Sequence, residues 1–596
     1  MPKDTPNITK LRKLRVKLRK IVSQQKNKNI TVIILSALVG LIVGLAAILI
    51  KQIIYAVENY AVSFFPGYLF FVLPMIGLLL VTFLNGNIFK KLVAFKGMQH
   101  VIQAIENHQS FINIRLIYAK FVTAGITIGF GGSSGMEAAI VTSGASIGSN
   151  LGKSLGLNYQ LRTLLIGCGT ASGISAMYNA PIGGFLFALE VILPEFTPAL
   201  LIPLLIASAT GKILFEMIMG ENLRFDAHVD AFSYESLPYV VLIGFAGAFT
   251  AMYMIKTYGF CYKILSRLNN PYLMALIGGG LLGCLIYIFP ALYGEGYVSI
   301  NRLLHGQETE VWKNSIFQNL DIPFQGLLVL LILLLLRPLS TGLSLSAGGE
   351  GGYFAPSLVA GGISGYLLYK LVILLSGHHL DLEGNTFIFL GMAATFACVM
   401  RAPVTAIFLI ADTTQSYAII VPLMIATTVA YTFKNYIDAH HPLKKDGHGP
   451  LQIEKFILNQ INLHNIIEPV NTFVYSNYTL RKIIEHFSNH DHAIIPVLNS
   501  ENKVVGIIEL KTVRELMKNF EQYDSIIAKQ LLQTEFTLIE YAQLRNQLVS
   551  NPELINLDYI LVSKKEIIIG YVSRYKLLNI FNNYLNTPDN LFGKFN

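Results

Sequence analysis

Two glycine-rich loops carry the residue types that could bind an anion inside an apolar chain. Residues 131–137 read GGSSGME and residues 348–356 read GGEGGYFAP, and each loop leads into an apolar stretch. The first turn of a helix has unpaired N–H groups and a partial positive charge, and glycine lets an ion approach the backbone. The loops therefore predict anion sites at helix starts. The alternative is that the glycines only allow close helix packing.

Glu137 ends the first loop, directly before an apolar run that begins at Ala138. A carboxylate at membrane depth is costly and indicates a functional site by default. At an anion-binding helix start, this carboxylate can occupy the position of the anion and leave it on protonation. A plain charge interaction with the helix start is the alternative.

The composition indicates that these loops lie in a membrane. The 596 residues are 53% hydrophobic and only 14% charged, whereas a soluble domain carries about 25% charged residues. Uncharged stretches long enough to cross a ~30 Å hydrocarbon core occur at residues 29–50, 59–89, 268–294 and 413–433. Between them, glycine- and proline-broken segments must line a buried or water-filled cavity, because their backbone cannot face lipid.

The membrane part of the sequence repeats itself. Residues 169–181 and 391–403 share glycine, alanine and proline at a constant offset of 222, and each copy continues into an apolar helix that ends in an acid, Glu190 or Asp412. Paired interrupted segments in two halves predict a transport site at the repeat interface.

Charge and cysteine usage narrow the function. The first 28 residues hold ten Lys and Arg against one Asp, and the whole chain has a net charge of +9. This basic arm predicts a cytoplasmic N-terminus beside the bilayer rather than nucleic-acid binding. The four cysteines form no CxxC pair, and no HExxH or GxSxG motif occurs, so we predict neither a metal site nor an enzyme.

The domain plan follows from these shifts in composition. We expect a basic arm at 1–28, a transmembrane domain at 29–433, a polar linker at 434–465 and a tail at 587–596. Between linker and tail, two βαββα-like modules are expected at 466–522 and 523–586, with strands at 493–498, 504–508, 559–562 and 567–572 and helices that include 538–548.

Taken together, the chain resembles the CLC family of chloride channels and chloride/proton exchangers, with a C-terminal pair of CBS modules. Residues 135–139 stand at the Gly-Arg/Lys-Glu-Gly-Pro signature of that family, and residues 179–190 and 351–356 match its other motifs closely. The resemblance implies a polytopic α-helical membrane protein with two inverted repeats and a small α/β CBS pair. It also implies a homodimer in the cell membrane, with the CBS modules in the cytoplasm.

The same resemblance assigns the site. Chloride is expected at the amides of Tyr353 and Phe354, after Gly352, and at the start of the Glu137 helix, at Gly135 and Met136, with Glu137 as the gate. Two departures bear on the inner pore. Lys96 stands where many members have serine, and Lys444 stands where they have tyrosine; each lysine either attracts the anion or extends to the cytoplasmic mouth.

The mode of transport rests on one further departure. Val191 stands where exchangers usually have a proton-carrying glutamate, and Glu190 lies beside it. Valine cannot relay protons, so the sequence favours a glutamate-gated chloride channel. Glu190 could substitute, which leaves a chloride/proton exchanger as the alternative. A CBS-bearing cation transporter is disfavoured, because a cation site needs several converging carboxylates.

The CBS modules lack the usual ribose-binding aspartates. The two relevant places read Glu509 and Thr512 in the first module, and Ser573 and Lys576 in the second. We therefore favour a structural or dimerising role over adenine-nucleotide binding, and no other cofactor is expected.

Overall fold

The computed structural model describes residues 28–64, 71–89, 98–107, 110–193, 197–220, 225, 234–318, 324–376, 383–440, 466–470, 472–489, 492–500, 503–517, 523–534, 536–550, 554, 557–564 and 567–577. The chain forms two compact units, residues 1–443 and 444–596, and each is described by itself.

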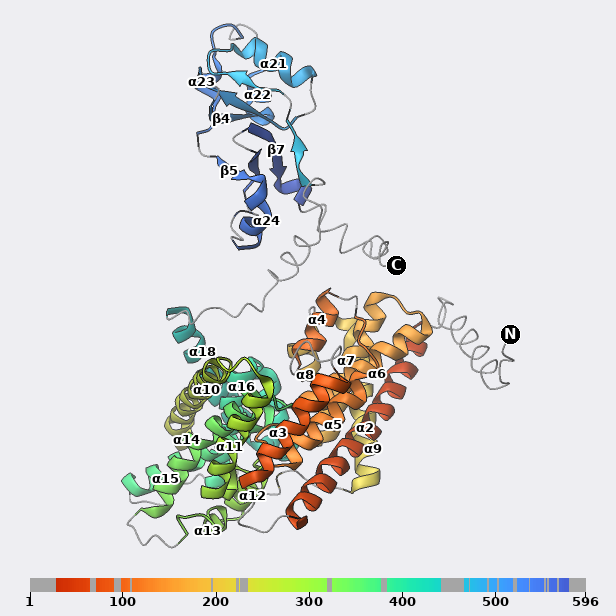
Figure 1. Ribbon diagram of the computed structural model, residues 1–596, viewed down its shortest axis with the longest axis vertical. Helices are drawn as coiled ribbons and strands as arrows, with labels where there is room; N and C mark the ends of the chain where they lie inside the picture. Colours follow the sequence, from red (N-terminus) through yellow and green to blue (C-terminus); the bar gives the residue numbers. More distant parts are fainter. Residues whose placement is uncertain are drawn as a thin grey trace, which may run out of the picture. The chain divides into compact units, whose positions relative to one another are not determined.

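The first unit is built of helices (Figure 1). Within the part of the chain that the structure describes, seven helices are long and apolar enough to cross a membrane. The helices that matter below are α2 (Lys28–Phe64), α3 (Leu73–Phe83), α5 (Leu116–Gly129), α6 (Glu137–Leu155), α7 (Tyr159–Tyr178), α8 (Pro181–Phe187), α9 (Leu201–Met219), α10 (Leu237–Leu265), α11 (Pro271–Ile288), α12 (Tyr297–Leu304), α13 (Glu308–Val311), α14 (Gln325–Ser346), α15 (Phe354–Ser376), α16 (Gly384–Met400), α17 (Pro403–Thr413) and α18 (Ile420–His440).

Two of the expected spans are single helices and two are not. Residues 29–50 lie within α2, and α11 covers the centre of residues 268–294. The stretch 59–89 is divided, because α2 ends at Phe64 and α3 begins at Leu73. The stretch 413–433 is divided between the end of α17 and the start of α18. Both α3 and α18 carry a proline in their first turn, a position where the missing N–H costs nothing and the chain can start a new helix.

The predicted repeat is present in the backbone. Asn179 ends α7 and Arg401 ends α16, each in the left-handed conformation with φ of 56°. In both copies an alanine outside the helical region follows, and then a proline opens the next helix. The two helix junctions, α7–α8 and α16–α17, are 222 residues apart in the sequence, as predicted.

The repeats also share one packing contact. Gly144 of α6 lies against the carbonyl of Gly169 in α7, and Gly361 of α15 lies in the same way against the carbonyl of Gly391 in α16. A Cβ atom at any of these positions would collide with the facing backbone. The glycines therefore let each loop-bearing helix approach its buried neighbour closely.

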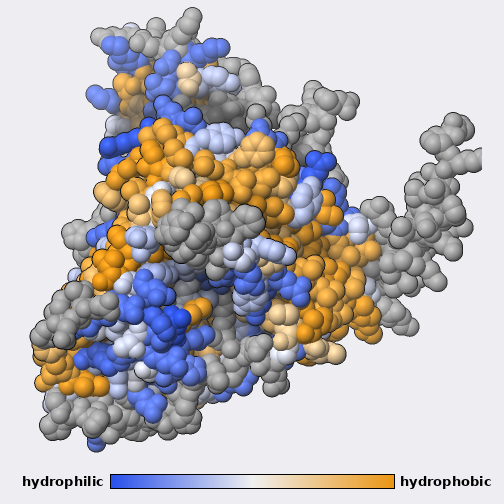
Figure 2. Space-filling view, turned by 60° about the horizontal axis from the view of Figure 1, so that its bottom comes forward, coloured by the Kyte–Doolittle hydropathy of each residue, from blue (hydrophilic) through white to orange (hydrophobic). Residues whose placement is uncertain are grey.

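The surface of this unit fits a lipid environment. Large apolar side chains such as Leu49, Phe249, Leu281, Leu335 and Met424 are exposed, and Figure 2 shows broad hydrophobic areas on the face of the unit that it presents. Hydrophilic side chains gather on the end that comes forward in that view. The protein is therefore a multi-pass membrane protein.

The second unit is a small α/β domain with two sheets, ordered β1-β7-β6-β5 and β2-β3-β4. Its strands are β1 (Glu468–Pro469), β2 (Val474–Tyr475), β3 (Ile494–Leu498), β4 (Val504–Glu509), β5 (Thr537–Glu540), β6 (Tyr559–Lys564) and β7 (Ile567–Ser573), and its helices include α21 (Leu480–Asn489), α22 (Leu510–Leu516) and α24 (Tyr541–Ser550). The four expected strands are present.

One helix begins later than the sequence predicts, since the expected range is 538–548. Residues 537–540 form strand β5, parallel to β6, and the helix begins only at Tyr541. Ile539 is buried in that strand. The β-branched Thr537 and Ile539 favour a sheet once a partner strand is available, and that partner is distant in sequence.

Candidate anion site between the two glycine loops

The two glycine loops meet each other. Gly135 donates its N–H to the carbonyl of Gly352 at 3.0 Å, and Gly352 donates to the carbonyl of Gly135 at 3.1 Å. This antiparallel pair holds the starts of α6 and α15 side by side. The positive ends of two helices, one from each repeat, therefore lie together.

The amides of Tyr353 and Phe354 are the donors best placed for an anion. They stand immediately before and at the first position of α15, where a helix provides no acceptor for its own N–H groups. The amides of Gly135 and Gly352, by contrast, already bond to each other. The ring of Phe354 is fully buried and packs on Phe396 and on Tyr178, with centroid distances of 4.6 and 4.9 Å.

Glu137 is fully buried at the first position of α6. Tyr178 donates its hydroxyl to Oε1 of Glu137, and the hydroxyl of Tyr297 lies 3.4 Å from the same oxygen. The two tyrosine hydroxyls also bond to each other. Oε2 has no hydrogen-bond partner among the described residues, and it lies where a Cβ of residue 135 would be, so Gly135 leaves room for the carboxylate.

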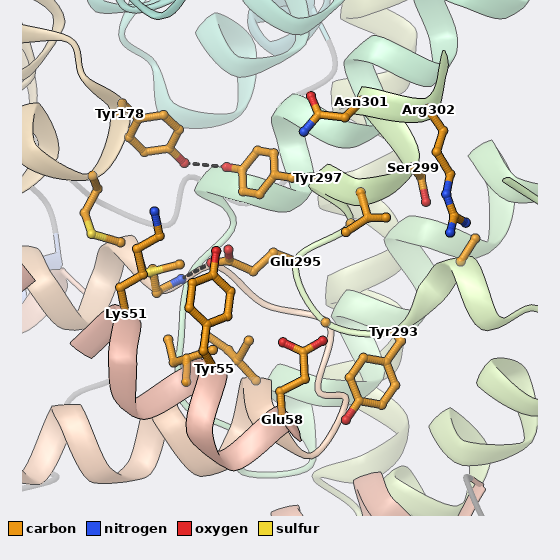
Figure 3. A pocket seen from close by; sticks show the side chains of 18 of the residues that line it. Lys51, Tyr55, Glu58, Tyr178, Tyr293, Glu295, Tyr297, Ser299, Asn301 and Arg302 are labelled. Carbon is orange, nitrogen blue, oxygen red and sulfur yellow. Dashed lines mark hydrogen bonds between the residues drawn. The ribbon is translucent and has the colours of Figure 1, made fainter. Parts of the chain in front are cut away.

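A cavity of about 580 Å³ lies next to the tyrosines that contact this carboxylate. We call it the vestibule; Tyr178, Tyr297 and Met136 are among the residues that line it. Figure 3 shows the hydroxyls of Tyr178 and Tyr297 pointing toward each other at its edge. The two hydroxyls thus connect the vestibule to Glu137.

Met136 donates its N–H to Oε1 of Glu295 at 2.9 Å. One of the amides that the sequence assigned to the anion is therefore bonded to a second carboxylate in this structure. Glu295 precedes α12 and also lines the vestibule.

A buried ion pair holds the second loop. Lys120 of α5 and Glu350 lie 2.8 Å apart, with side-chain exposures of 3% and 4%. Glu350 also donates its N–H to Thr127 at 3.0 Å, and its carbonyl accepts from Ser134 at 3.2 Å. The pair therefore ties α5 and the first loop to the second loop.

Sequence reasoning missed these supporting residues. Charges at positions 120 and 350 inside apolar segments were a usable signal, because an intramembrane ion is costly without a partner. Tyr178 and Tyr297 gave no such signal, since they are 119 residues apart and nothing in the sequence indicates that they meet.

The two repeat acids cap each other's helices. Glu190 accepts the N–H groups of Val404 at 3.3 Å and Thr405 at 2.8 Å, at the start of α17. Asp412 accepts those of Ile182 at 2.7 Å and Gly183 at 3.0 Å, at the start of α8. Carboxylates at helix N-termini are stabilising.

This capping bears on the proton pathway considered for Glu190. Both of its oxygens accept hydrogen bonds from α17. The neighbouring Val191 is half-buried and apolar. Lys96 and Lys444, the two lysines expected near the inner pore, lie outside the described residues.

In the α/β unit, Ser573, which stands at a place where the family resemblance implies a ribose-binding residue, is bonded to a carboxylate. Ser573 donates to Oε1 of Glu468 at 2.6 Å, and Tyr571 donates to Oε2 at 2.9 Å. Burial and the nearby Glu468 carboxylate raise the pKa of Tyr571 above its usual value. Glu509 closes β4, and Lys576 donates its N–H to Ser573 at 3.3 Å.

Known proteins resemble this chain in both sequence and structure. The family described as voltage gated chloride channel matches residues 77–435, and the CBS domain matches residues 464–519. The H(+)/Cl(-) exchange transporter ClcA of Vibrio cholerae is 27% identical over 73% of this chain and 93% of its own length. The putative chloride channel protein ClcB-like of Ralstonia nicotianae is 28% identical over 57% of this chain and 77% of its own.

Solved structures share the fold. A slow cyanobacterial Cl⁻/H⁺ antiporter covers 70% of this chain and 99% of its own length, with a TM-score of 0.57 and 20% identity. A eukaryotic CLC transporter covers 94% and 98%, with a TM-score of 0.57 and 17% identity. Since the family match spans more than half of the residues, this chain belongs to the voltage-gated chloride channel, or CLC, family and carries a CBS domain.

Proposed function

We propose that the protein exchanges chloride for protons across the membrane, with Glu137 both as gate of the anion site and as proton carrier. The observation that carries the proposal is the position of this one carboxylate. It is fully buried at the start of α6, beside the amides at the start of α15, and hydroxyls link it to the vestibule.

The chemistry follows from charge. An ionised Glu137 is itself an anion at the positive ends of two helices, so it competes with chloride for that position. Protonation removes the charge, and chloride can then occupy the amides of Tyr353 and Phe354. The Tyr178 and Tyr297 hydroxyls donate and accept protons, which gives protons from the vestibule a path to the carboxylate.

Two relatives named as exchangers, ClcA and the cyanobacterial antiporter, support exchange over the channel that the sequence favours. A chloride channel is the second candidate for two reasons. Val191 cannot relay protons, and both carboxylate oxygens of Glu190 already accept hydrogen bonds from α17. Exchange therefore requires an inner proton route that bypasses both residues.

Coupling is tested with purified protein in liposomes under a chloride gradient, with external pH recorded. Exchange predicts that chloride movement drives protons against their own gradient. Chloride flux without uphill proton movement would reject exchange and leave the channel.

The basic N-terminal arm supports a cytoplasmic N-terminus. Figure 1 places the start of α2 and the end of α18 at one end of the membrane unit and α12 at the other. With this orientation, the CBS modules lie in the cytoplasm and the vestibule opens outside.

We further propose a homodimer, as the family resemblance implies, with one pathway per subunit. For the CBS pair we propose a structural or dimerising role. Neither expected ribose position carries an Asp, and the Ser573 hydroxyl is already bonded to Glu468 within the domain.

A further inference from the structure

Glu295 lies in a turn whose backbone is held rigidly. Gly294 and Gly296 flank it with φ of 61° and 91°, in the left-handed region that glycine adopts without strain. The fully buried Arg337 of α14 donates to the carbonyls of Leu292 at 3.0 Å, Gly294 at 2.8 Å and Glu295. The turn therefore fixes where the side chain of Glu295 begins.

The carboxylate reaches the start of α6 from the vestibule side. Its Oε1 accepts the N–H of Met136 at 2.9 Å, and Figure 3 shows it beside the vestibule wall. Met136 is the N-cap residue of α6, so its N–H belongs to the positive end of the helix. Glu295 thus bonds a donor of the proposed anion site.

Two carboxylates therefore converge on one helix start. Glu137 is fully buried and its Oε2 has no partner among the described residues, whereas Glu295 is half-buried and in contact with the vestibule. A carboxylate on an amide is displaced by another anion that offers the same charge. An anion arriving from the vestibule must first replace Glu295 at Met136.

We propose that Glu295 is a second internal competitor for the anion site, located at its vestibule mouth, and that it sets the affinity for small monovalent anions entering from that side. This inference rests on the proposed function of Glu137 and the two loops as an anion site. It assigns a distinct step to Glu295, since Glu137 controls passage and Glu295 controls entry.

A second acid of the vestibule serves as the experimental control for Glu295. The cations Lys51, Arg302 and Lys313 and the acids Glu58, Glu216 and Glu295 line it. Removing either Glu58 or Glu295 changes the vestibule charge by the same amount. Of these two acids, Glu295 is the one that bonds the Met136 amide.

The test compares Glu295→Ala, Glu295→Gln and Glu58→Gln by calorimetric titration of the purified full chain with chloride. Glu295→Ala is expected to bind chloride about 10-fold more tightly, the scale of one charge-assisted hydrogen bond. Glu295→Gln keeps the volume without the charge and should gain less. Glu58→Gln should change affinity by less than about 2-fold, since a solvated vestibule screens its charge.

Crystals soaked in bromide give a second readout. The proposal predicts anomalous density beside the Met136 amide in Glu295→Ala and none there in the unmodified protein. Equal affinity gains in Glu58→Gln and Glu295→Ala would reduce Glu295 to a general field effect, and weaker binding in Glu295→Ala would make it a support for the anion. Both results would overturn the proposal, and neither depends on whether protons are coupled.

Discussion

The two halves of the membrane unit have the same backbone plan but different chemistry at the helix starts that face each other. Asn179 and Arg401 end equivalent helices with the same φ, and Glu190 and Asp412 cap each other's repeats. Aligning the paired glycines Gly135 and Gly352 places Glu137 opposite Phe354. One half thus supplies an acid and the other a buried aromatic ring.

The features that the two halves share build the anion site, whereas the features that differ determine which half contains a titratable group. The symmetric features build two adjacent positive helix ends, which is what an anion requires. Only the α6 end has an acid at its first position, so only that half can respond to a proton there. The α15 end is instead fixed by the Lys120–Glu350 pair.

The largest expected effect comes from breaking the pair that fixes the second loop. Lys120→Met leaves Glu350 buried without its cation and should destabilise the protein by about 3–5 kcal/mol, measured by thermal unfolding in detergent. The double variant Lys120→Met/Glu350→Gln should recover most of this loss. Lys212→Met, which removes a half-exposed partner of Glu216, should have little effect. A single variant as stable as the double would show that the pair does not hold the loop.

A smaller effect is expected from the two reciprocal caps, because they differ in burial. Asp412 is 6% exposed and also accepts the hydroxyl of Tyr417, whereas Glu190 is half-buried. Asp412→Ala should cost about 2 kcal/mol and Glu190→Ala about 1 kcal/mol in the same unfolding measurement. Loss of stability in one variant only would contradict the reciprocal arrangement.

The smallest effect is expected from removing the Tyr178 hydroxyl, which bonds Glu137 at the start of α6. Tyr178→Phe keeps the ring but removes the hydroxyl that donates to Glu137 and joins it to Tyr297, so the pH profile of chloride flux in liposomes should change. Tyr293→Phe is the matched control, since its hydroxyl lines the same vestibule but donates to Gly129 at 2.7 Å. An unchanged profile in Tyr178→Phe, or the same shift in the control, would separate the tyrosine from the gate.

The sequence predicted the symmetric features better than the asymmetric ones. A constant offset locates the repeat, and glycine loops before apolar helices indicate anion sites, because these signals are local. The partners of Glu137, Met136 and Glu350 come from residues 41, 159 and 230 positions away, and no periodicity reveals them. Strand β5 was missed for the same reason, since its partner β6 fixes its conformation.

The central claim is that one carboxylate both gates chloride and carries protons. Glu137→Gln removes the charge and keeps the volume, so it separates these roles in liposomes that report chloride and pH together. The account predicts that chloride flux persists and loses most of its pH dependence, while proton movement against its gradient disappears. Uphill proton movement that survives in Glu137→Gln would contradict the account.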